Sequence, residues 1–269
     1  MVIQHNIAAN NAYRNLSSNS ANGQKNLEKL SSGFRINRSA DDAAGLAISE
    51  QMRSKINGLD QATANANDAI GLIQTAEGAL TETHSMLQRM VTLATQSANG
   101  TYNTTARSAI SAEVAALKSE IDRIASTTDY NGVKPLAASS AIQVQVGPTS
   151  GETLDIAAAK MDVSSLSIKD IKVSTVSTAN SAITKINAAI DKVSSHRANL
   201  GASQNRLEHT INNLKTTSEN MTAAESRIRD TDMAKEMAAF TKNNILNQAA
   251  QSMLSQANQQ PQGVLSLLR

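Results

Sequence analysis

The sequence contains no cysteine and no tryptophan, and only three tyrosines and two phenylalanines occur among its 269 residues. Without cysteine, disulfide bonds and thiolate metal sites are excluded. A globular core of this size would normally use more aromatic side chains to bury apolar area. A core of Leu, Ile and Ala at helical spacing is more typical of a bundle of long helices, so we expect a mainly α fold.

Proline, excess charge and long apolar runs are also scarce. We expect the three prolines, Pro135, Pro148 and Pro261, to lie outside helices. A net charge of +2, from 25 basic and 23 acidic residues, argues against a nucleic-acid-binding face. No apolar run reaches the roughly 18 residues that suggest a membrane-spanning helix. The stretch Met1–His5 lacks the basic start and apolar run of a signal peptide.

Residues that could carry catalytic or metal chemistry are not grouped in the sequence. Asp41 and Asp42 could form a carboxylate pair for acid–base chemistry, but no partner base is evident, and helix capping explains them better. We therefore expect a protein that is not an enzyme. We also expect no cofactor and no metal site, because the four histidines lack metal-binding spacing: His5, His84, His196 and His209.

The longest pattern lies between Ile183 and Ile228, where residues recur at alternating steps of three and four. The spacing predicts a helix over about 177–229 that needs other helices along it. Four polar residues on this pattern are expected to set the register or to pair with a charge on a neighbouring helix: Arg197, Gln204, Ser218 and Glu225. The predicted bundle seam is the row that is apolar throughout: Ile186, Val193, Leu200, Leu207, Leu214, Met221 and Ile228.

Four further helices are predicted, over about 3–32, 39–98, 105–126 and 233–258. Gly33 is expected to stop the first of them. Ser39, with Asp42 three residues later, resembles a short capping box that would start the second. Between the third helix and the long pattern, apolar and polar residues alternate around Val144 and again around Leu154, which predicts a β-hairpin.

Both ends of the chain are nearly free of charge. No charged residue occurs from Asn243 to Leu268, and from Met1 to Gln24 the only formal side-chain charge is that of Arg14. Asn and Gln alternate with apolar residues in the C-terminal stretch. Such a segment is too polar to collapse alone and suits one that becomes ordered inside an assembly.

Several stretches together resemble bacterial flagellin. The most specific is LSSGFRINRSADDAAGLAIS at residues 30–49, and the matches follow in order along nearly the whole chain. Large variable outer domains, which many flagellins carry, are missing, so the chain resembles a minimal flagellin. The other matching stretches are residues 73–80, 130–133, 200–207, 224–230 and 264–269.

The resemblance implies a long antiparallel helical coiled-coil bundle formed by both chain ends, with one small β-hairpin region. It implies paired terminal helices at 1–40 and 233–269, a helical bundle at 41–130 and 174–232, and the hairpin segment at 131–173. The function implied is a structural subunit that polymerises into the flagellar filament for motility. The residues expected to carry polymerisation are Leu16, Leu27, Leu30, Phe240, Leu246, Met253, Leu265 and Leu268.

The resemblance also implies partners and a location. The partners are further copies of the chain, an export chaperone at the C-terminal segment, a filament cap and a vertebrate Toll-like receptor. The protein is expected to be extracellular, exported through the flagellar secretion channel without a cleaved signal peptide. The positions that match the family's receptor-recognition surface are Arg89, Leu93, Gln96 and Glu113; Val91 and Thr92 stand where the family often has Arg and Glu.

One alternative is a flagellar junction or adaptor protein that shares these ends but does not polymerise extensively. The stretch from Leu30 to Ser49 argues against it. An enzyme is the other alternative, and no nucleophile–base pair, phosphate-binding loop or metal-ligand spacing supports it.

Overall fold

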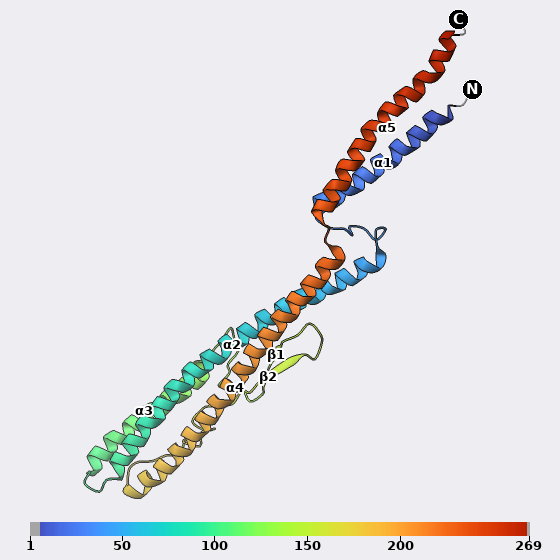
Figure 1. The fold of residues 1–269 in the computed structure, drawn as a ribbon. Coiled ribbons are helices and arrows are strands. Elements are labelled where there is room, and N and C mark those ends of the chain that lie inside the picture. The colour runs from blue at the N-terminus through green and yellow to red at the C-terminus, as the bar shows by residue number, and fades with distance from the viewer. Residues whose placement is uncertain (1–5, 268–269) are drawn as a thin grey trace. The chain divides into compact units, whose positions relative to one another are not determined.

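The computed structural model describes residues 6–267, and the side chains of residues 6–260. This part of the chain contains five helices and one two-stranded antiparallel sheet (Figure 1), which confirms the mainly α fold. The elements are α1 (Ile7–Ser32), α2 (Ala43–Ala98), α3 (Thr104–Thr127), β1 (Ile142–Gln145), β2 (Thr153–Ile156), α4 (Val176–Arg229) and α5 (Met233–Leu267).

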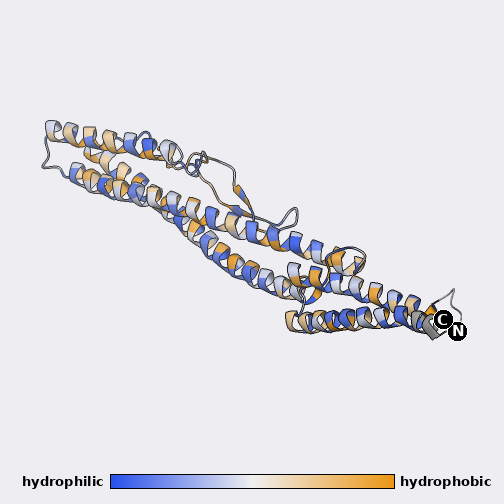
Figure 2. Cartoon of the chain, turned by 90° about the horizontal axis from the view of Figure 1, so that it is seen from above, coloured by the Kyte–Doolittle hydropathy of each residue, from blue (hydrophilic) through white to orange (hydrophobic). Residues whose placement is uncertain are grey.

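The chain forms two compact units. The first combines residues up to Ile56 with those from Glu219 onwards, and the second is Asn57–Ser218. Helices α2 and α4 each contribute to both units. Along the long helices, polar and apolar residues are interspersed rather than gathered in continuous blocks (Figure 2).

The core of the second unit is aliphatic. Leu80 and Leu87 from α2, Ile121 from α3 and Ile156 from β2 are almost fully buried there, together with Leu207 from α4. The predicted hairpin is confirmed, with Val144 paired to Leu154. Each buried Leu or Ile contributes roughly 1.5–3 kcal/mol by leaving water, so a core of this kind needs no tryptophan.

Two glycines let other segments approach α2 closely. A Cβ atom on Gly58 would lie 2.7 Å from the Cβ of Pro148, in the hairpin loop. A Cβ atom on Gly71 would lie 2.9 Å from the hydroxyl oxygen of Tyr130, in the turn after α3. Larger residues at these positions would push the hairpin loop and the turn away from the helix.

The start of α2 differs from the prediction. The helix begins at Ala43, and the carboxylate of Asp42 caps it by accepting the backbone N–H of Gly45 at 2.9 Å. Ser39 is therefore not the cap. Asp41 accepts the backbone N–H groups of Asn37 and Arg38, at 3.2 and 3.0 Å, and so holds residues 37–41 in a turn.

The prediction for Pro261 was also wrong, because α5 continues through this residue to Leu267. A proline has no N–H with which to bond the carbonyl four residues earlier, that of Ala257. Here that carbonyl accepts a hydrogen bond from the side-chain Nδ2 of Asn6, at 2.8 Å. The hydrogen bond that proline cannot make is thus replaced from the other end of the chain.

Candidate assembly surface

Helices α1 and α5 pack against each other lengthwise in the first unit, with the start of α1 beside the end of α5 (Figure 1). Both helices have defined ends. Asn6 caps the start of α1 by accepting the N–H of Ala9 at 3.0 Å, and Gly33 ends it with φ of 75°, in the left-handed conformation that favours glycine. Asp232 caps the start of α5.

Much of the apolar surface left in solvent lies on these two helices. Met253 is 68% exposed and Ile245 is 61% exposed, although both are large apolar side chains. On a helical wheel at about 100° per residue, Ile245, Leu246 and Met253 share one flank of α5. Exposed apolar patches of this kind mark interaction surfaces. The other large apolar residues exposed on α1 and α5 are Ile7, Tyr13, Leu27, Met233 and Met237.

The opposite flank of α5 is exposed and polar. It carries Asn244, Gln248, Gln251 and Ser255, and the wheel places them on the far side from Leu246 and Met253. From Asn243 to Gln260 the exposed surface of α5 therefore has one flank with the large apolar side chains and one uncharged polar flank.

The six described side chains among the residues predicted to carry polymerisation divide into two groups. Leu27, Leu246 and Met253 are exposed. Leu16, Leu30 and Phe240 are half-buried. Leu265 belongs to α5, but its side chain lies outside the described part, and Leu268 lies outside the described residues altogether.

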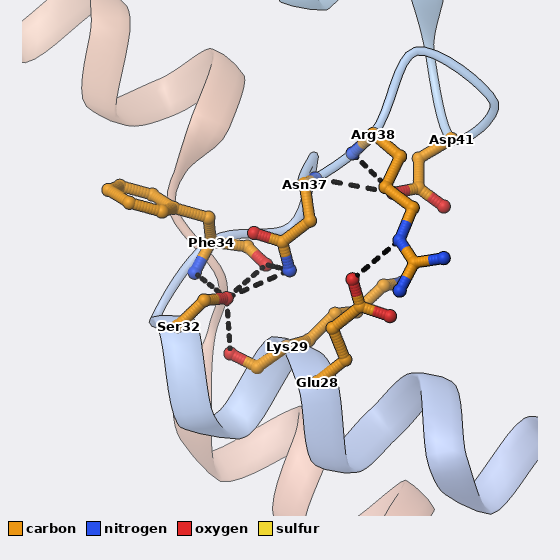
Figure 3. A network of polar contacts seen from close by, with 7 residues as sticks. All are labelled: Glu28, Lys29, Ser32, Phe34, Asn37, Arg38 and Asp41. Atoms are coloured by element: carbon orange, nitrogen blue, oxygen red, sulfur yellow. Dashed lines mark hydrogen bonds and ion pairs between the residues drawn. The ribbon is translucent and has the colours of Figure 1, made fainter.

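Residues 32–41 connect α1 to α2 through a network of polar contacts (Figure 3). Ser32 Oγ accepts the N–H of Phe34 at 3.1 Å and the side-chain Nδ2 of Asn37 at 2.9 Å. Arg38 pairs with Glu28 at 2.9 Å. The backbone N–H groups of Arg38 and Asn37 lower the pKa of Asp41, because they stabilise its charged form.

Arg229 joins this connection to the other half of the chain. Its guanidinium lies 4.8 Å from the centre of the Phe34 ring and pairs with Glu50 at 2.5 Å. Its carbonyl accepts the backbone N–H of Arg35 at 2.6 Å, and Thr231 donates to the carbonyl of Gly33 at 3.0 Å. The hydrogen bond from Arg229 lowers the pKa of Glu50.

Burial along the predicted seam of α4 changes with position. The five seam residues from Ile186 to Leu214 are buried, whereas Met221 and Ile228, in the first unit, are half-buried. The second buried row consists of Ala182, Ala189, His196 and Ser203. Burial lowers the pKa of His196, because the charged imidazolium would lose its hydration there.

Two of the four polar residues on the repeating pattern of α4 have partners on α2. Arg197 pairs with Glu77 at 3.4 Å, and Ser218 donates to Asp60 at 3.0 Å. Gln204 bonds within its own helix, to Glu208 at 3.0 Å.

Three of the four positions matched to the receptor surface are exposed. Arg89 on α2 pairs with Glu113 on α3 at 2.8 Å. Gln96 donates to the hydroxyl of Tyr102 at 3.0 Å. Leu93 is 2% exposed and belongs to the core of the second unit. The structure therefore brings Arg89 and Glu113 together and places Leu93 beneath the surface.

Sequence reasoning missed two groups of residues. The contact of Arg229 with Phe34 and Glu50 joins segments far apart in the chain, and no spacing rule relates them. The contact between the half-buried Asn26 of α1 and Asn243 of α5, 3.0 Å from Asn26 Oδ1 to Asn243 Nδ2, was missed because Asn is common throughout both ends. Their recurrence at helical spacing from the apolar residues Leu30 and Leu254 was the one available signal.

Two kinds of site are absent from the described residues. No three His, Asp or Glu side chains among them gather as metal ligands, and no helix in that part combines the length and hydropathy of a membrane span. The site is instead a pair of terminal helices with apolar side chains left in solvent. This defines the class of self-assembling helical structural proteins.

Comparison with known proteins gives the family. The profile of the bacterial flagellin N-terminal helical region matches residues 3–141, and that of the bacterial flagellin C-terminal helical region matches residues 183–268. The chain belongs to the bacterial flagellin family. Flagellins are structural subunits of the extracellular flagellar filament, so the expectations of a filament subunit and of a protein that is not an enzyme are confirmed, and the junction or adaptor alternative is not favoured.

Two curated relatives match this chain along its whole length, and a solved structure matches part of it. The chain is 56% identical over 274 residues to a flagellin of Halalkalibacterium halodurans and 50% identical over 304 residues to a flagellin of Bacillus subtilis, with 100% of both chains covered in each case. The crystal structure of Bacillus cereus flagellin is 37% identical, with a TM-score of 0.52, and the match covers 60% of this chain and 94% of that one.

Proposed function

We propose that the terminal helices of this flagellin carry its polymerisation, with the apolar flank of α5 against neighbouring subunits. The observation that carries this proposal is the exposure of Ile245 and Met253 on a helix whose last 26 residues before Arg269 carry no charge. Repeated heterologous contacts that do not close into a ring give a helical filament. The polar flank with Gln248 and Ser255 then faces the water-filled channel of the tube.

The proposed domains follow the same division. Residues 1–40 and 233–269 form the inner core of the filament, residues 41–130 and 174–232 form the helical bundle outside it, and residues 131–173 belong to that bundle. The seam of α4, from Ile186 to Ile228, holds the protomer together. Its burial in the second unit supports this role.

Removal of Asn243–Arg269 tests the proposal. We expect the shortened chain to remain a soluble helical monomer, because the buried core of the second unit is untouched, and to form no filaments. Sedimentation velocity with short filament seeds, together with circular dichroism, measures both properties. Seeded growth of filaments by the shortened chain would contradict the assignment.

The same shortened chain tests a second partner. We propose that an export chaperone binds the C-terminal segment, whose mixture of Asn, Gln and apolar residues suits ordering on a partner. Chaperone binding should be lost with that segment.

We further propose a filament cap as partner, and export through the flagellar channel without a cleaved signal peptide. Intact-mass spectrometry of the filament protein tests this route of export. Loss of N-terminal residues beyond Met1 would contradict it.

A vertebrate Toll-like receptor is the remaining proposed partner, with Arg89, Gln96 and Glu113 as its recognition surface and the buried Leu93 beneath it. The exposed ion pair of Arg89 and Glu113 on two adjacent helices supports it. We expect Arg89→Ala to weaken receptor activation at least about tenfold, as loss of an interface arginine commonly does. Arg123→Ala, which breaks the exposed pair with Glu120 on α3, is the control; equal activation by both variants would contradict the surface.

A further inference from the structure

Asparagine is followed directly by glycine at several places in the chain. In this dipeptide the asparagine side chain loses its amide most readily, because glycine has no side chain to hinder attack of its backbone nitrogen on the side-chain carbonyl carbon. The asparagines concerned are Asn22, Asn57, Asn99 and Asn131. All of them are exposed, so access to water does not distinguish them. The state of the glycine N–H does.

Three of these glycines have their N–H held by an acceptor. Gly23 and Gly58 lie within α1 and α2, where each N–H bonds the carbonyl four residues earlier. Gly132 donates its N–H to the carboxylate of Asp129 at 3.1 Å, and the negative charge there opposes loss of the amide proton. Attack by any of these nitrogens first requires local opening of a helix or a turn.

The pair Asn99 and Gly100 lies in the connection between α2 and α3 (Figure 1) and is different. The N–H of Tyr102 bonds the carbonyl of Asn99 at 3.4 Å and closes a β-turn. Gly100 is the second residue of this turn, and its N–H has no acceptor among the described residues. The nitrogen that attacks is therefore free in the folded chain.

Two donors in the same connection stabilise the charges that the reaction develops. Asn99 Oδ1 accepts the backbone N–H of Thr101 at 3.1 Å. This bond folds the side chain over the following peptide bond and places a donor on the oxygen that becomes negative during attack. Arg107 of α3 donates Nη2 to the backbone carbonyl of Asn99 at 3.0 Å. That carbonyl is conjugated with the Gly100 nitrogen, so the guanidinium charge favours the amide anion.

We propose that Asn99 is a site of spontaneous deamidation, with Gly100 as the nucleophile and with Arg107 and the N–H of Thr101 as the groups that promote the reaction. The Gly100 nitrogen loses its proton and bonds to Asn99 Cγ. The Cγ–Nδ2 bond breaks, and Nδ2 takes up a proton and leaves as ammonia. Water then opens the resulting succinimide ring at either carbonyl. The product is an aspartyl or isoaspartyl residue that carries one negative charge.

The reaction changes the connection in which it occurs. The new carboxylate is formed beside the guanidinium of Arg107. The isoaspartyl product also adds a methylene group to the backbone between α2 and α3. Tyr102 lies in the same turn, and its hydroxyl accepts a hydrogen bond from Gln96 at 3.0 Å. The change therefore extends to the exposed surface of α2 that carries Gln96.

Peptide mass spectrometry of the folded, full-length chain tests the proposal, because trypsin places the three pairs of the second unit on separate peptides. The peptides that contain Asn57, Asn99 and Asn131 are 56–89, 90–107 and 124–160. During incubation at mildly alkaline pH we expect Asn99 to convert at least about tenfold faster than the other two, which depend on local opening. In urea the three should convert at similar rates. A digest of unincubated protein corrects for conversion during digestion.

Two variants separate the groups in the proposal. Arg107→Gln keeps a donor for the Asn99 carbonyl but removes the charge, and should slow conversion by about tenfold, a factor that a hydrogen bond to a charged group can supply. Gly100→Pro removes the attacking N–H at a turn position that favours proline, and should abolish conversion. Arg123→Gln, at an exposed arginine elsewhere on α3, is the control and should convert like the unsubstituted chain.

Conversion at Asn57 or Asn131 as fast as at Asn99 in the folded chain would overturn the proposal. So would an Asn99 that stays intact in the folded chain but converts in urea, because the turn would then protect it. Equal rates in Arg107→Gln and Arg123→Gln would contradict the role of Arg107, and conversion in Gly100→Pro would contradict attack by the backbone nitrogen. Circular dichroism checks that each variant is folded. If one is not, the comparison within the unsubstituted chain still decides.

Discussion

Replacement of Ile245 and Met253 together by lysine is expected to abolish filament formation while leaving the protomer folded. Both side chains are more than half exposed in the protomer, so the charges cost little there. In the proposed subunit contact the same charges would be withdrawn from water without partners, which costs several kcal/mol per ion. Two such charges in every subunit would cost more free energy than the subunit contact supplies.

The control for this variant is Gln248→Lys with Ser255→Lys. It adds the same two charges to the same charge-free stretch, on the polar flank of α5, where they remain in water. Seeded growth followed by light scattering should therefore stop for the first variant and continue for the second. Equal growth of the two variants, or arrest of both, would contradict the assignment of the apolar flank to the subunit contact.

Replacement of Leu207 by alanine is expected to reduce the free energy of unfolding by about 2–5 kcal/mol, because a fully buried leucine leaves a cavity. Met221 lies on the same heptad row of α4, two heptads later, but is half-buried. Met221→Ala should cost about 1 kcal/mol or less. Leu207 and Met221 occupy the same heptad position and differ in burial. A larger loss of unfolding free energy in Leu207→Ala than in Met221→Ala therefore reports burial and not heptad position.

Urea unfolding followed by circular dichroism measures the difference between these two variants. Polymerisation has to be prevented during the measurement, so both substitutions belong in the chain shortened at Lys242. Equal losses of stability would mean that the seam is packed uniformly along α4, contrary to the burial in the structure.

Much of the fold follows from periodicity and end signals in the sequence. The repeat from Ile183 to Ile228 predicts α4 almost to the residue, and Gly33 marks the end of α1, because each pattern is local to one element. The alternation around Val144 and Leu154 predicts the hairpin for the same reason.

The features that sequence reasoning missed depend on contacts between distant segments. Pro261 is tolerated inside α5 because Asn6, at the other end of the chain, bonds the carbonyl that proline leaves free. Ser39 loses the capping position to Asp42 because Asp41 closes a turn just before the helix. Local propensity describes what each residue type favours. It contains no information about the partner that decides the role of a particular residue.

The candidate site was foreseen only in part. The absence of charge pointed to both chain ends, but the sequence pattern did not separate Leu16, which is half-buried, from Leu27, which is exposed. Buried Leu93 was grouped with exposed Arg89 because a motif match carries no information on burial.

Negative-stain electron microscopy of the purified, unmodified chain, with and without short filament seeds, tests the central claim most directly. The account predicts long tubes of uniform width that grow from the seeds. If the intact chain forms no polymer in either sample, the account is contradicted. The terminal helices would then belong to a junction or adaptor protein.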